Sequence, residues 1–307
     1  MSATLPSASR NVLCLGQARV DLICERPVAM LTQADAFVPH FGGAVANVAM
    51  MSARAGARIA LAGAVGDDEW GRWLYHQLAR AGVDLGRFRL VEDMETPISL
   101  TTVGSGGEPA ARLHGAASSL LAGASTADVE LAVQDAGGLF ISSCTLADSG
   151  DRAITMRARE LALERRYPVV FDANREAGGW SADGDGAGAA NACVPGALLV
   201  HVNAQEAHLL TGERDLEQAA RVLLENGAHN VVVTAGDQPA ILRGELRMDV
   251  PAAAARVIST LGAGDALMAA LLARLQTTGF YVPAIAASLR EAMVVAARAC
   301  ERWGACD

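Results

Sequence analysis

The sequence predicts an α/β fold in which helices cover both faces of a mostly parallel sheet. Short runs of β-branched and other apolar residues alternate with longer helical stretches along the chain. Hydrophobic residues make up 51% of the 307 residues and charged residues only 19%, so the chain can bury a large core. It shows no internal repeat and no linker. We therefore expect residues 1–307 to form one domain.

The predicted elements follow one another in a regular order. An apolar strand at 12–16 opens the fold, and polar and apolar residues then alternate from Val20 to Ile23. The helices predicted at 45–55 and 69–81 are each followed by a glycine, the residue that most readily adopts the left-handed conformation ending many helices. Further strands are predicted at 58–65, 139–142, 168–172, 198–203 and 231–234, and further helices at 152–166, 215–225, 263–275 and 283–302.

Residues 95–116 interrupt this alternation. Residues 97–103 and 110–114 are strand-like, and the glycine-rich stretch GSGGEP between them predicts a β-hairpin. Together with a strand around Arg19–Cys24, the hairpin is expected to form a small sheet, a lid built from about 17–40 and 95–116. The low-complexity stretch SADGDGAGAANA at 181–192 is expected to be a flexible surface loop.

All 25 basic residues are arginine, and the chain contains no lysine. This excludes a P-loop with its GK[ST] lysine, a eukaryotic-type protein kinase and Schiff-base chemistry, because each depends on a lysine. The formal net charge of −9 and the pI near 5.2 argue against binding to nucleic acid or to an anionic membrane, since both need a basic surface. We expect neither partner.

The remaining composition indicates an intracellular protein without a structural metal. The six cysteines form no C-x-x-C pair and are expected to be buried free thiols, and the six histidines show no metal-ligand spacing. The first ten residues, MSATLPSASR, lack the apolar segment of a signal peptide and are expected to be a disordered leader. No apolar run reaches membrane-spanning length. The sequence therefore predicts a cytoplasmic protein.

Two glycine-containing segments precede apolar helices, and each places one polar residue in the first turns. Gly42 and Gly43 precede the helix that carries Asn47, and Gly262 and Gly264 precede Asp265. Backbone N–H groups at a helix start attract anions, and glycine lets a phosphate approach them closely. Asp265 would then be placed to accept the proton of a hydroxyl that attacks phosphorus. The alternative is a glycine-rich turn whose aspartate only complements the helix dipole.

These two segments, GGAVANVA at 42–49 and GAGDA at 262–266, resemble the signatures of the ribokinase-like (phosphofructokinase-B type) carbohydrate kinase family. Further segments match in the same order: Gly16 with Asp21, AVGDDEWG at 64–71, NAQE at 203–206 and TAG at 234–236. The likeness extends over residues 11 to 305. It implies a three-layer α/β/α fold with a small β-sheet lid, and transfer of the γ-phosphoryl group of ATP to a hydroxyl.

The resemblance also assigns roles to single positions. Asp265 matches the catalytic base of the family, and the backbone of Gly262, Ala263 and Gly264 matches its anion hole. Four positions match those that bind the hydroxyl groups of the sugar: Asp21, Gly42, Gly43 and Asn47.

On the nucleotide side, Asn203 and Glu206 match the pair that organises Mg²⁺ and the triphosphate. Glu206 is expected to act on the metal through water. Thr234 and Gly236 match the wall of the ATP site beside the phosphates. ATP and Mg²⁺ are therefore the implied cofactors. Ser259 stands where family members activated by a monovalent cation carry an aspartate, so activation by K⁺ is left open.

The acceptor is expected to be a small free sugar. Ala44 stands where kinases of phosphorylated sugars tend to carry a lysine, and FDAN at 171–174, before Trp180, is most similar to fructokinase-type members. Arg175 follows one residue earlier than the arginine of those members, so it either serves the site or lies on the surface. Arg112 and His114 in the lid either touch the substrate or face solvent.

Two other functions remain open at this point. One is a nucleoside kinase, including a pseudouridine-type enzyme. The other is a non-catalytic sensor of sugars or nucleotides on the same fold. The partners in either case are small molecules, a sugar or a nucleoside with ATP. Because lid sheets of this family often pair across subunits, a homodimer through the lid is also implied.

Overall fold

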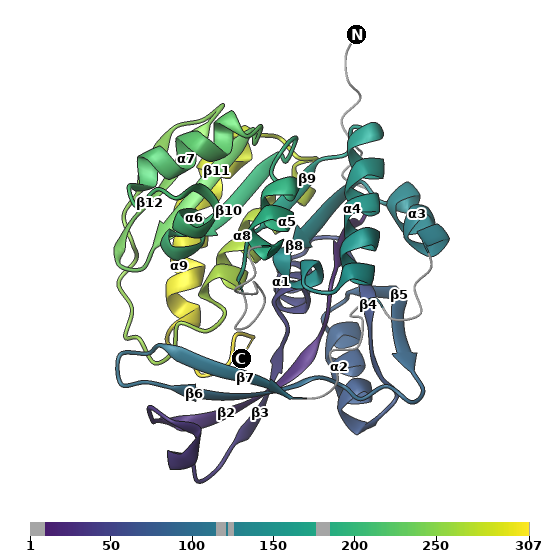
Figure 1. Ribbon diagram of the computed structural model, residues 1–307, viewed down its shortest axis with the longest axis vertical. Coiled ribbons are helices and arrows are strands. Elements are labelled where there is room, and N and C mark those ends of the chain that lie inside the picture. The colour runs from purple at the N-terminus through teal and green to yellow at the C-terminus, as the bar shows by residue number, and fades with distance from the viewer. Residues whose placement is uncertain (1–9, 115–120, 122–125, 176–184, 307) are drawn as a thin grey trace.

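The computed structural model describes residues 10–114, 121, 126–175 and 185–306. Among these residues, nine strands form one large sheet (Figure 1). Neighbouring strands pair in parallel, except for two antiparallel pairs formed by the three strands at one edge of the sheet. The strands, in spatial order, are β13 (Met248–Val250), β12 (Gln238–Gly244), β11 (Asn230–Ala235), β10 (Leu199–Asn203), β9 (Val169–Asp172), β8 (Gly138–Ser142), β1 (Val12–Leu15), β4 (Ile59–Gly66) and β5 (Asp84–Val91).

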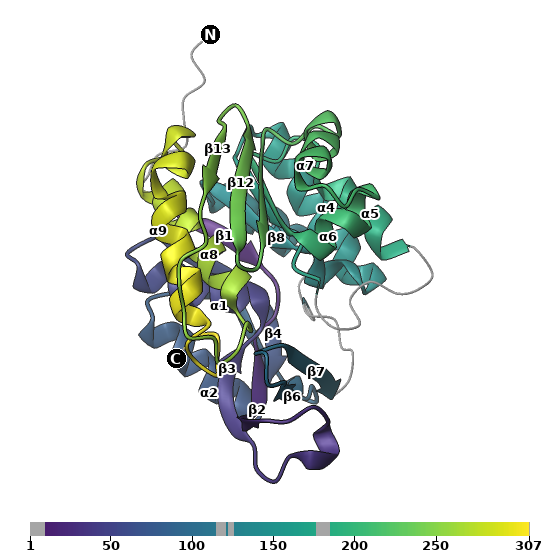
Figure 2. The same ribbon diagram turned by 90° about the vertical axis from the view of Figure 1, so that its left-hand side faces the viewer.

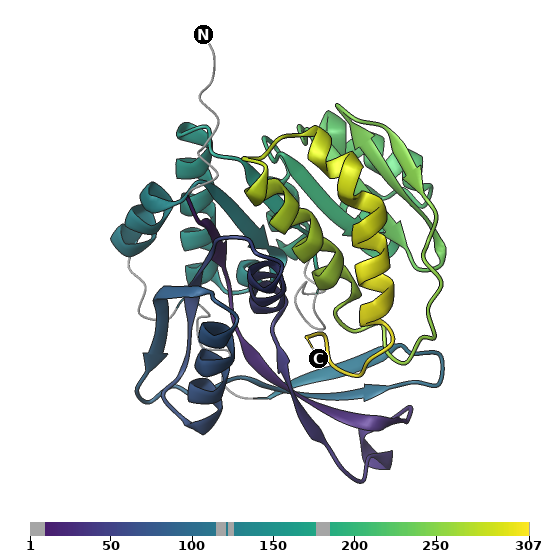
Figure 3. The ribbon, with the colours of Figure 1, turned by 180° about the vertical axis from the view of Figure 1, so that it is seen from behind.

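Helices cover both faces of this sheet, because successive residues of its central strands face opposite sides. Cys14 and Phe140 pack in one hydrophobic core, whereas Leu13 and Ile141 pack in the other. The first core includes α1 (Ala44–Arg54), α2 (Glu69–Arg80), α8 (Ala263–Thr277) and α9 (Pro283–Ala299), seen in Figure 3. The second includes α3 (Thr126–Asp135), α4 (Ser149–Glu164), α5 (Asp185–Cys193), α6 (Ala204–Thr211) and α7 (Leu216–Glu225). The predicted α/β architecture is confirmed, and it has three layers.

A smaller sheet lies beside the large one (Figure 2). Its described strands, in spatial order, are β3 (Val38–Gly42), β2 (Arg19–Pro27), β6 (Ile98–Val103) and β7 (Pro109–His114). β6 and β7 form the predicted hairpin, and β2 pairs with β6 in parallel. Two short 3₁₀ helices, at Leu31–Gln33 and Ser143–Leu146, complete the described elements.

Two of the predicted segments are corrected by the structure. The loop predicted at 181–192 is wrong from residue 185 onward, because α5 begins there. Ala190 and Cys193 of α5 are fully buried, so close packing compensates for the low helix propensity of its glycines. The last predicted helix ends at Ala299, short of residue 302.

Some predictions fall on parts of the chain that the structure does not describe. These are the leader apart from Arg10, residues 115 and 116 of the predicted lid, residues 181–184 and Trp180. Across the described ranges, none of the helices has the length and apolar character needed to span a membrane.

Candidate active site

A cavity of about 1050 Å³ lies between the small sheet and the carboxyl ends of the large sheet's strands. β1 pairs with β4 on one side and with β8 on the other, so the strand order reverses at β1, where open α/β sheets usually bind ligands. The sequence predicted twelve site residues, and all of them except Gly42 and Gly43 line this cavity: Asp21, Asn47, Asn203, Glu206, Thr234, Gly236, Gly262, Ala263, Gly264 and Asp265.

Asp265 lies in the first turn of α8, which begins after Gly262. Gly262 has a left-handed backbone, with φ 77°, and a Cβ added to it would lie 2.2 Å from the Cβ of Ala305. Glycine alone meets both demands without strain. The N–H groups of Gly264 and Asp265 belong to the first turn and have no acceptor within the helix. The positive end of the α8 dipole therefore points toward the cavity that these residues line.

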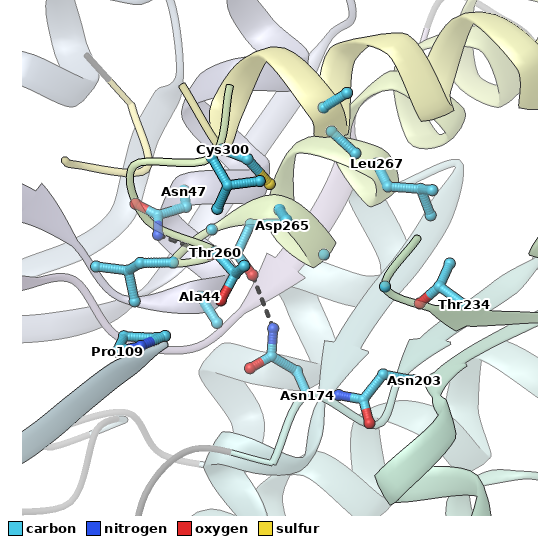
Figure 4. Close-up of a pocket in the computed structure, with 18 of the residues that line it drawn as sticks. Ala44, Asn47, Pro109, Asn174, Asn203, Thr234, Thr260, Asp265, Leu267 and Cys300 are labelled. Carbon is cyan, nitrogen blue, oxygen red and sulfur yellow. Dashed lines mark hydrogen bonds between the residues drawn. The ribbon is translucent and has the colours of Figure 1, made fainter. Parts of the chain in front are cut away.

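Two asparagine side chains hold the carboxylate of Asp265, which is only 6% exposed (Figure 4). Nδ2 of Asn47 donates to Oδ2 at 2.8 Å, and Nδ2 of Asn174 donates to Oδ1 at 2.7 Å. A buried carboxylate needs such donors, because an unpaired one costs several kcal/mol. The sequence predicted Asn47 as a sugar ligand, but it did not predict this contact or any role for Asn174.

At the small-sheet end of the cavity, Asp21 on β2 is almost fully buried. Its Oδ1 accepts a hydrogen bond from Nε of Arg19 at 2.7 Å, and among the described residues its Oδ2 has no hydrogen-bond partner. A Cβ on Gly42 would lie 2.2 Å from Oδ2, so the carboxylate fits only against glycine. Gly43 precedes α1 with φ 96°. Both glycines therefore shape the backbone behind the cavity wall and do not line it.

At the other end, Asn203 and Glu206 form a reciprocal cap at the start of α6. Oδ1 of Asn203 accepts from the Glu206 N–H at 2.9 Å, and Oε2 of Glu206 accepts from the Asn203 N–H at 2.8 Å. Oε1 of Glu206 accepts from the N–H of Arg175, also at 2.8 Å. Burial raises the pKa of Glu206, and the nearby Asp172 raises it further, although the N–H donors act in the opposite direction.

A buried histidine between these groups was missed by the sequence prediction. Nδ1 of His201 on β10 lies 2.8 Å from Oδ1 of Asp172, and its Nε2 lies 3.1 Å from Oγ1 of Thr234. Burial acts to lower the pKa of His201, but the carboxylate of Asp172 outweighs it and the pKa is raised. One signal was available: Asp172 and His201 are polar residues within apolar strand segments, and they are register partners on adjacent parallel strands.

The structure shows where the residues lie whose roles the sequence left open. Arg112 and His114 on β7 are exposed and do not line the cavity, whereas the alternate residues Ala111 and Leu113 do. Arg175 lines the cavity. Ser259 is fully buried, and its Oγ accepts from the N–H of Leu261 at 3.1 Å.

Known proteins resemble this chain over nearly its whole length. Fructokinase-1 of Oryza sativa subsp. japonica is 30% identical over 270 residues, which cover 87% of this chain and 83% of the relative. A fructokinase double mutant from Vibrio cholerae O395, solved with fructose, ADP and a potassium ion bound, has 25% identity and a TM-score of 0.84 and covers 100% of this chain and 96% of its own.

The aminoimidazole riboside kinase of Salmonella enterica, solved with aminoimidazole riboside and an ATP analogue, has 25% identity and a TM-score of 0.80. That likeness covers 96% of this chain and 95% of the other. The model of the pfkB family carbohydrate kinases matches residues 9–307. The ribokinase-like fold and the matched sequence agree with the cavity described above. The chain therefore belongs to the pfkB family of carbohydrate kinases, enzymes that transfer a phosphoryl group to a hydroxyl group of a sugar.

Proposed function

We propose that this carbohydrate kinase transfers the γ-phosphoryl group of ATP to a hydroxyl of a small free sugar, as a fructokinase does. The observation that carries the proposal is the position of Asp265. This carboxylate lies at the amino end of α8, and Asn47 and Asn174 each donate a hydrogen bond to one of its two oxygens. Two donors and a helix start together give a fixed base next to an anion-binding backbone.

In the proposed reaction, the acceptor hydroxyl gives its proton to Asp265 as its oxygen forms a bond to the γ-phosphorus. The bond from that phosphorus to the β–γ bridging oxygen breaks, and ADP leaves. The N–H groups around the start of α8, from Gly262 to Asp265, stabilise the negative charge of the phosphoryl group in transfer. Oδ2 of Asp21, which has no partner among the described residues, accepts a hydrogen bond from another hydroxyl of the acceptor.

The nucleotide is proposed to lie along the other half of the cavity, beside Asn203, Thr234 and Gly236. No group of three or more histidine, cysteine, aspartate or glutamate side chains in the described ranges could hold a metal ion directly. This fits Mg²⁺ bound mainly by phosphates and waters, which is its preferred mode with nucleotides. Both oxygens of Glu206 already accept an N–H, so this side chain suits a contact through water better than direct ligation. Mg²⁺ supplies charge neutralisation on the phosphates when bound.

The small sheet is proposed to act as a lid and as a dimer contact. It contributes Arg19, Asp21, Ser99 and Leu113 to the cavity wall, so its movement toward α8 would exclude water, a competing acceptor. β3 and β7 are the outer strands of this sheet within the described ranges, and an outer strand offers unpaired backbone groups to a second copy.

A second candidate is a kinase of nucleoside-like acceptors. It is favoured by the likeness to the aminoimidazole riboside kinase, which equals the likeness to the Vibrio cholerae fructokinase in sequence identity.

The deciding experiment is a panel of acceptors in an assay that couples ADP release to NADH oxidation. The panel contains fructose, other hexoses, ribose, aminoimidazole riboside, pseudouridine and common nucleosides, each with Mg²⁺ and either Na⁺ or K⁺. We expect a free sugar to give the highest kcat/KM. Rapid turnover of a nucleoside with no turnover of any sugar would contradict the proposal. The comparison of Na⁺ with K⁺ decides whether Ser259 still permits activation by K⁺.

A further inference from the structure

The orientation of the Asn47 side-chain amide decides whether it can donate a hydrogen bond to Asp265. An amide can be turned so that its oxygen and nitrogen exchange places. With Nδ2 toward Asp265, as in the structure, the amide donates to Oδ2 at 2.8 Å. In the opposite orientation, the amide oxygen would face a carboxylate oxygen, and both atoms are acceptors. The hydrogen bond from Asn47 to Asp265 would be lost.

Asn174, the other donor, is fixed by its own surroundings. Its Nδ2 lies 2.7 Å from Oδ1 of Asp265 and 3.4 Å from Oδ2 of Asp172. Two carboxylates therefore attract the same nitrogen. Among the described residues Nδ2 of Asn47 donates to a single carboxylate, that of Asp265, so a group at its Oδ1 adds to the selection of its orientation.

The thiol of Cys306 is placed to make that selection. Sγ of Cys306 lies 3.3 Å from Oδ1 of Asn47, and both side chains are buried. An S–H group is a weak donor, and an amide oxygen is an acceptor whereas an amide nitrogen is not. The thiol therefore favours the orientation in which Oδ1 faces Cys306 and Nδ2 faces Asp265.

Two contacts hold the segment that carries this thiol. Nη1 of Arg54 donates to the carbonyl oxygen of Cys306 at 2.9 Å. Arg54 follows Asn47 by two turns on α1, so one helix face contacts both the backbone and the side chain of Cys306. The preceding residue, Ala305, packs against Gly262 at the start of α8. The segment thus touches both glycine-led helix starts of the site.

We infer that Cys306 is a positioning residue of the phosphoryl-transfer site: it orients the Asn47 amide and thereby keeps a second donor on Asp265. The catalytic consequence rests on the proposed function, but the contact between Cys306 and Asn47 does not. The conservative replacement by serine retains a donor at this position, whereas alanine removes it.

The test compares Cys306→Ala, Cys306→Ser, Asn47→Ala and the double variant Cys306→Ala/Asn47→Ala. We expect Cys306→Ala to lower kcat roughly 5- to 10-fold, the lower end of what an unsatisfied buried acceptor costs. Cys306→Ser should keep at least about half of the wild-type kcat, and KM for ATP should not change. In the Asn47→Ala background, Cys306→Ala should have no further effect on kcat, because it acts through Asn47.

A matched control is Cys193→Ala. Cys193 is also a buried thiol, with Sγ 3.7 Å from Sδ of Met156, and it lies in the other hydrophobic core, away from the cavity. Its replacement should lower stability and leave kcat unchanged. A comparable loss of kcat in this variant would show that Cys306→Ala acts only through stability, and would overturn the inference.

Urea unfolding of the wild type, Cys306→Ala, Asn47→Ala and the double variant tests the contact without any acceptor. Non-additive losses of stability for Cys306→Ala and Asn47→Ala would support the contact, and additive losses would overturn it. Wild-type kcat in Cys306→Ala would overturn the positioning role even if the stabilities are coupled. If the wild type phosphorylates no acceptor, the proposed function fails together with that role, whereas the stability cycle still decides the contact.

Discussion

The replacement Asp265→Asn tests the proposed base directly. In the structure, each oxygen of Asp265 accepts from an amide NH₂ group. Whichever way an asparagine at 265 is turned, its own NH₂ group faces the NH₂ group of Asn47 or Asn174. The variant therefore loses the base and also one hydrogen bond in the ground state.

The two losses have different magnitudes. An unmade buried hydrogen bond costs about 1–3 kcal/mol. Removal of a general base lowers the rate by about 10²–10⁴-fold, which corresponds to about 3–5 kcal/mol in the activation free energy. We therefore expect kcat to fall at least about 100-fold, while KM for ATP changes little. Coupled ADP release measures kcat, and calorimetry measures nucleotide binding.

Asp151→Asn is the matched control. Asp151 is the third residue of α4, as Asp265 is of α8, and it is also buried, with Oδ1 accepting the N–H of Leu121 at 3.1 Å. Its replacement should lower stability and leave kcat within about twofold of the wild type. A kcat for Asp265→Asn within tenfold of the wild type would refute the assignment of the base.

Three further replacements test the surroundings of the site by urea unfolding. Gly262→Ala should lower the free energy of unfolding by about 2 kcal/mol or more, because the left-handed backbone and the contact with Ala305 both oppose a Cβ. Asp68→Ala removes the cap of α2 and should cost about 1–2 kcal/mol at pH 7. Burial acts to raise the pKa of Asp68, but hydrogen bonds from Gly71 and Thr96 lower it, so the difference from the wild type should shrink as the pH falls through that lowered value. Glu206→Gln should keep the cap of α6 but lower turnover more than about tenfold. Because burial raises the pKa of Glu206, the folded wild type loses stability as the pH rises above the ordinary glutamate range, and the variant should lack that slope. The glutamine NH₂ group cannot accept the Arg175 N–H, so the variant also loses that hydrogen bond at every pH.

Local patterns predicted the parts of the fold that depend on local interactions. The β6–β7 hairpin was found because its glycine-rich turn lies between two strand-like runs. β5 was missed because it is an outer strand in which polar and apolar residues are mixed, so no apolar run marks it. α5 was missed because its sequence, DGAGAANAC, has a low helix propensity that only tertiary packing compensates.

In the candidate site, too, local patterns predicted some residues, whereas contacts between distant residues were not predicted. The glycines and Asp265 belong to short segments that a single reading of the sequence can detect. The contacts of Asn47 with Asp265 and with Cys306 join residues 218 and 259 positions apart, and no spacing rule connects them. The pair of Asp172 with His201 depends on the register of β9 against β10, which the sequence does not specify.

Residues from both sheets form the cavity wall, and this arrangement has an evolutionary consequence. Ser99, Ala111 and Leu113 reach the cavity from the small sheet, whereas the large sheet and α8 carry the residues proposed for chemistry. Substitutions on β6 and β7 can thus change which molecule is accepted without disturbing the machinery of transfer. Descendants of one ancestral enzyme could in this way acquire new acceptors while they inherit the same reaction.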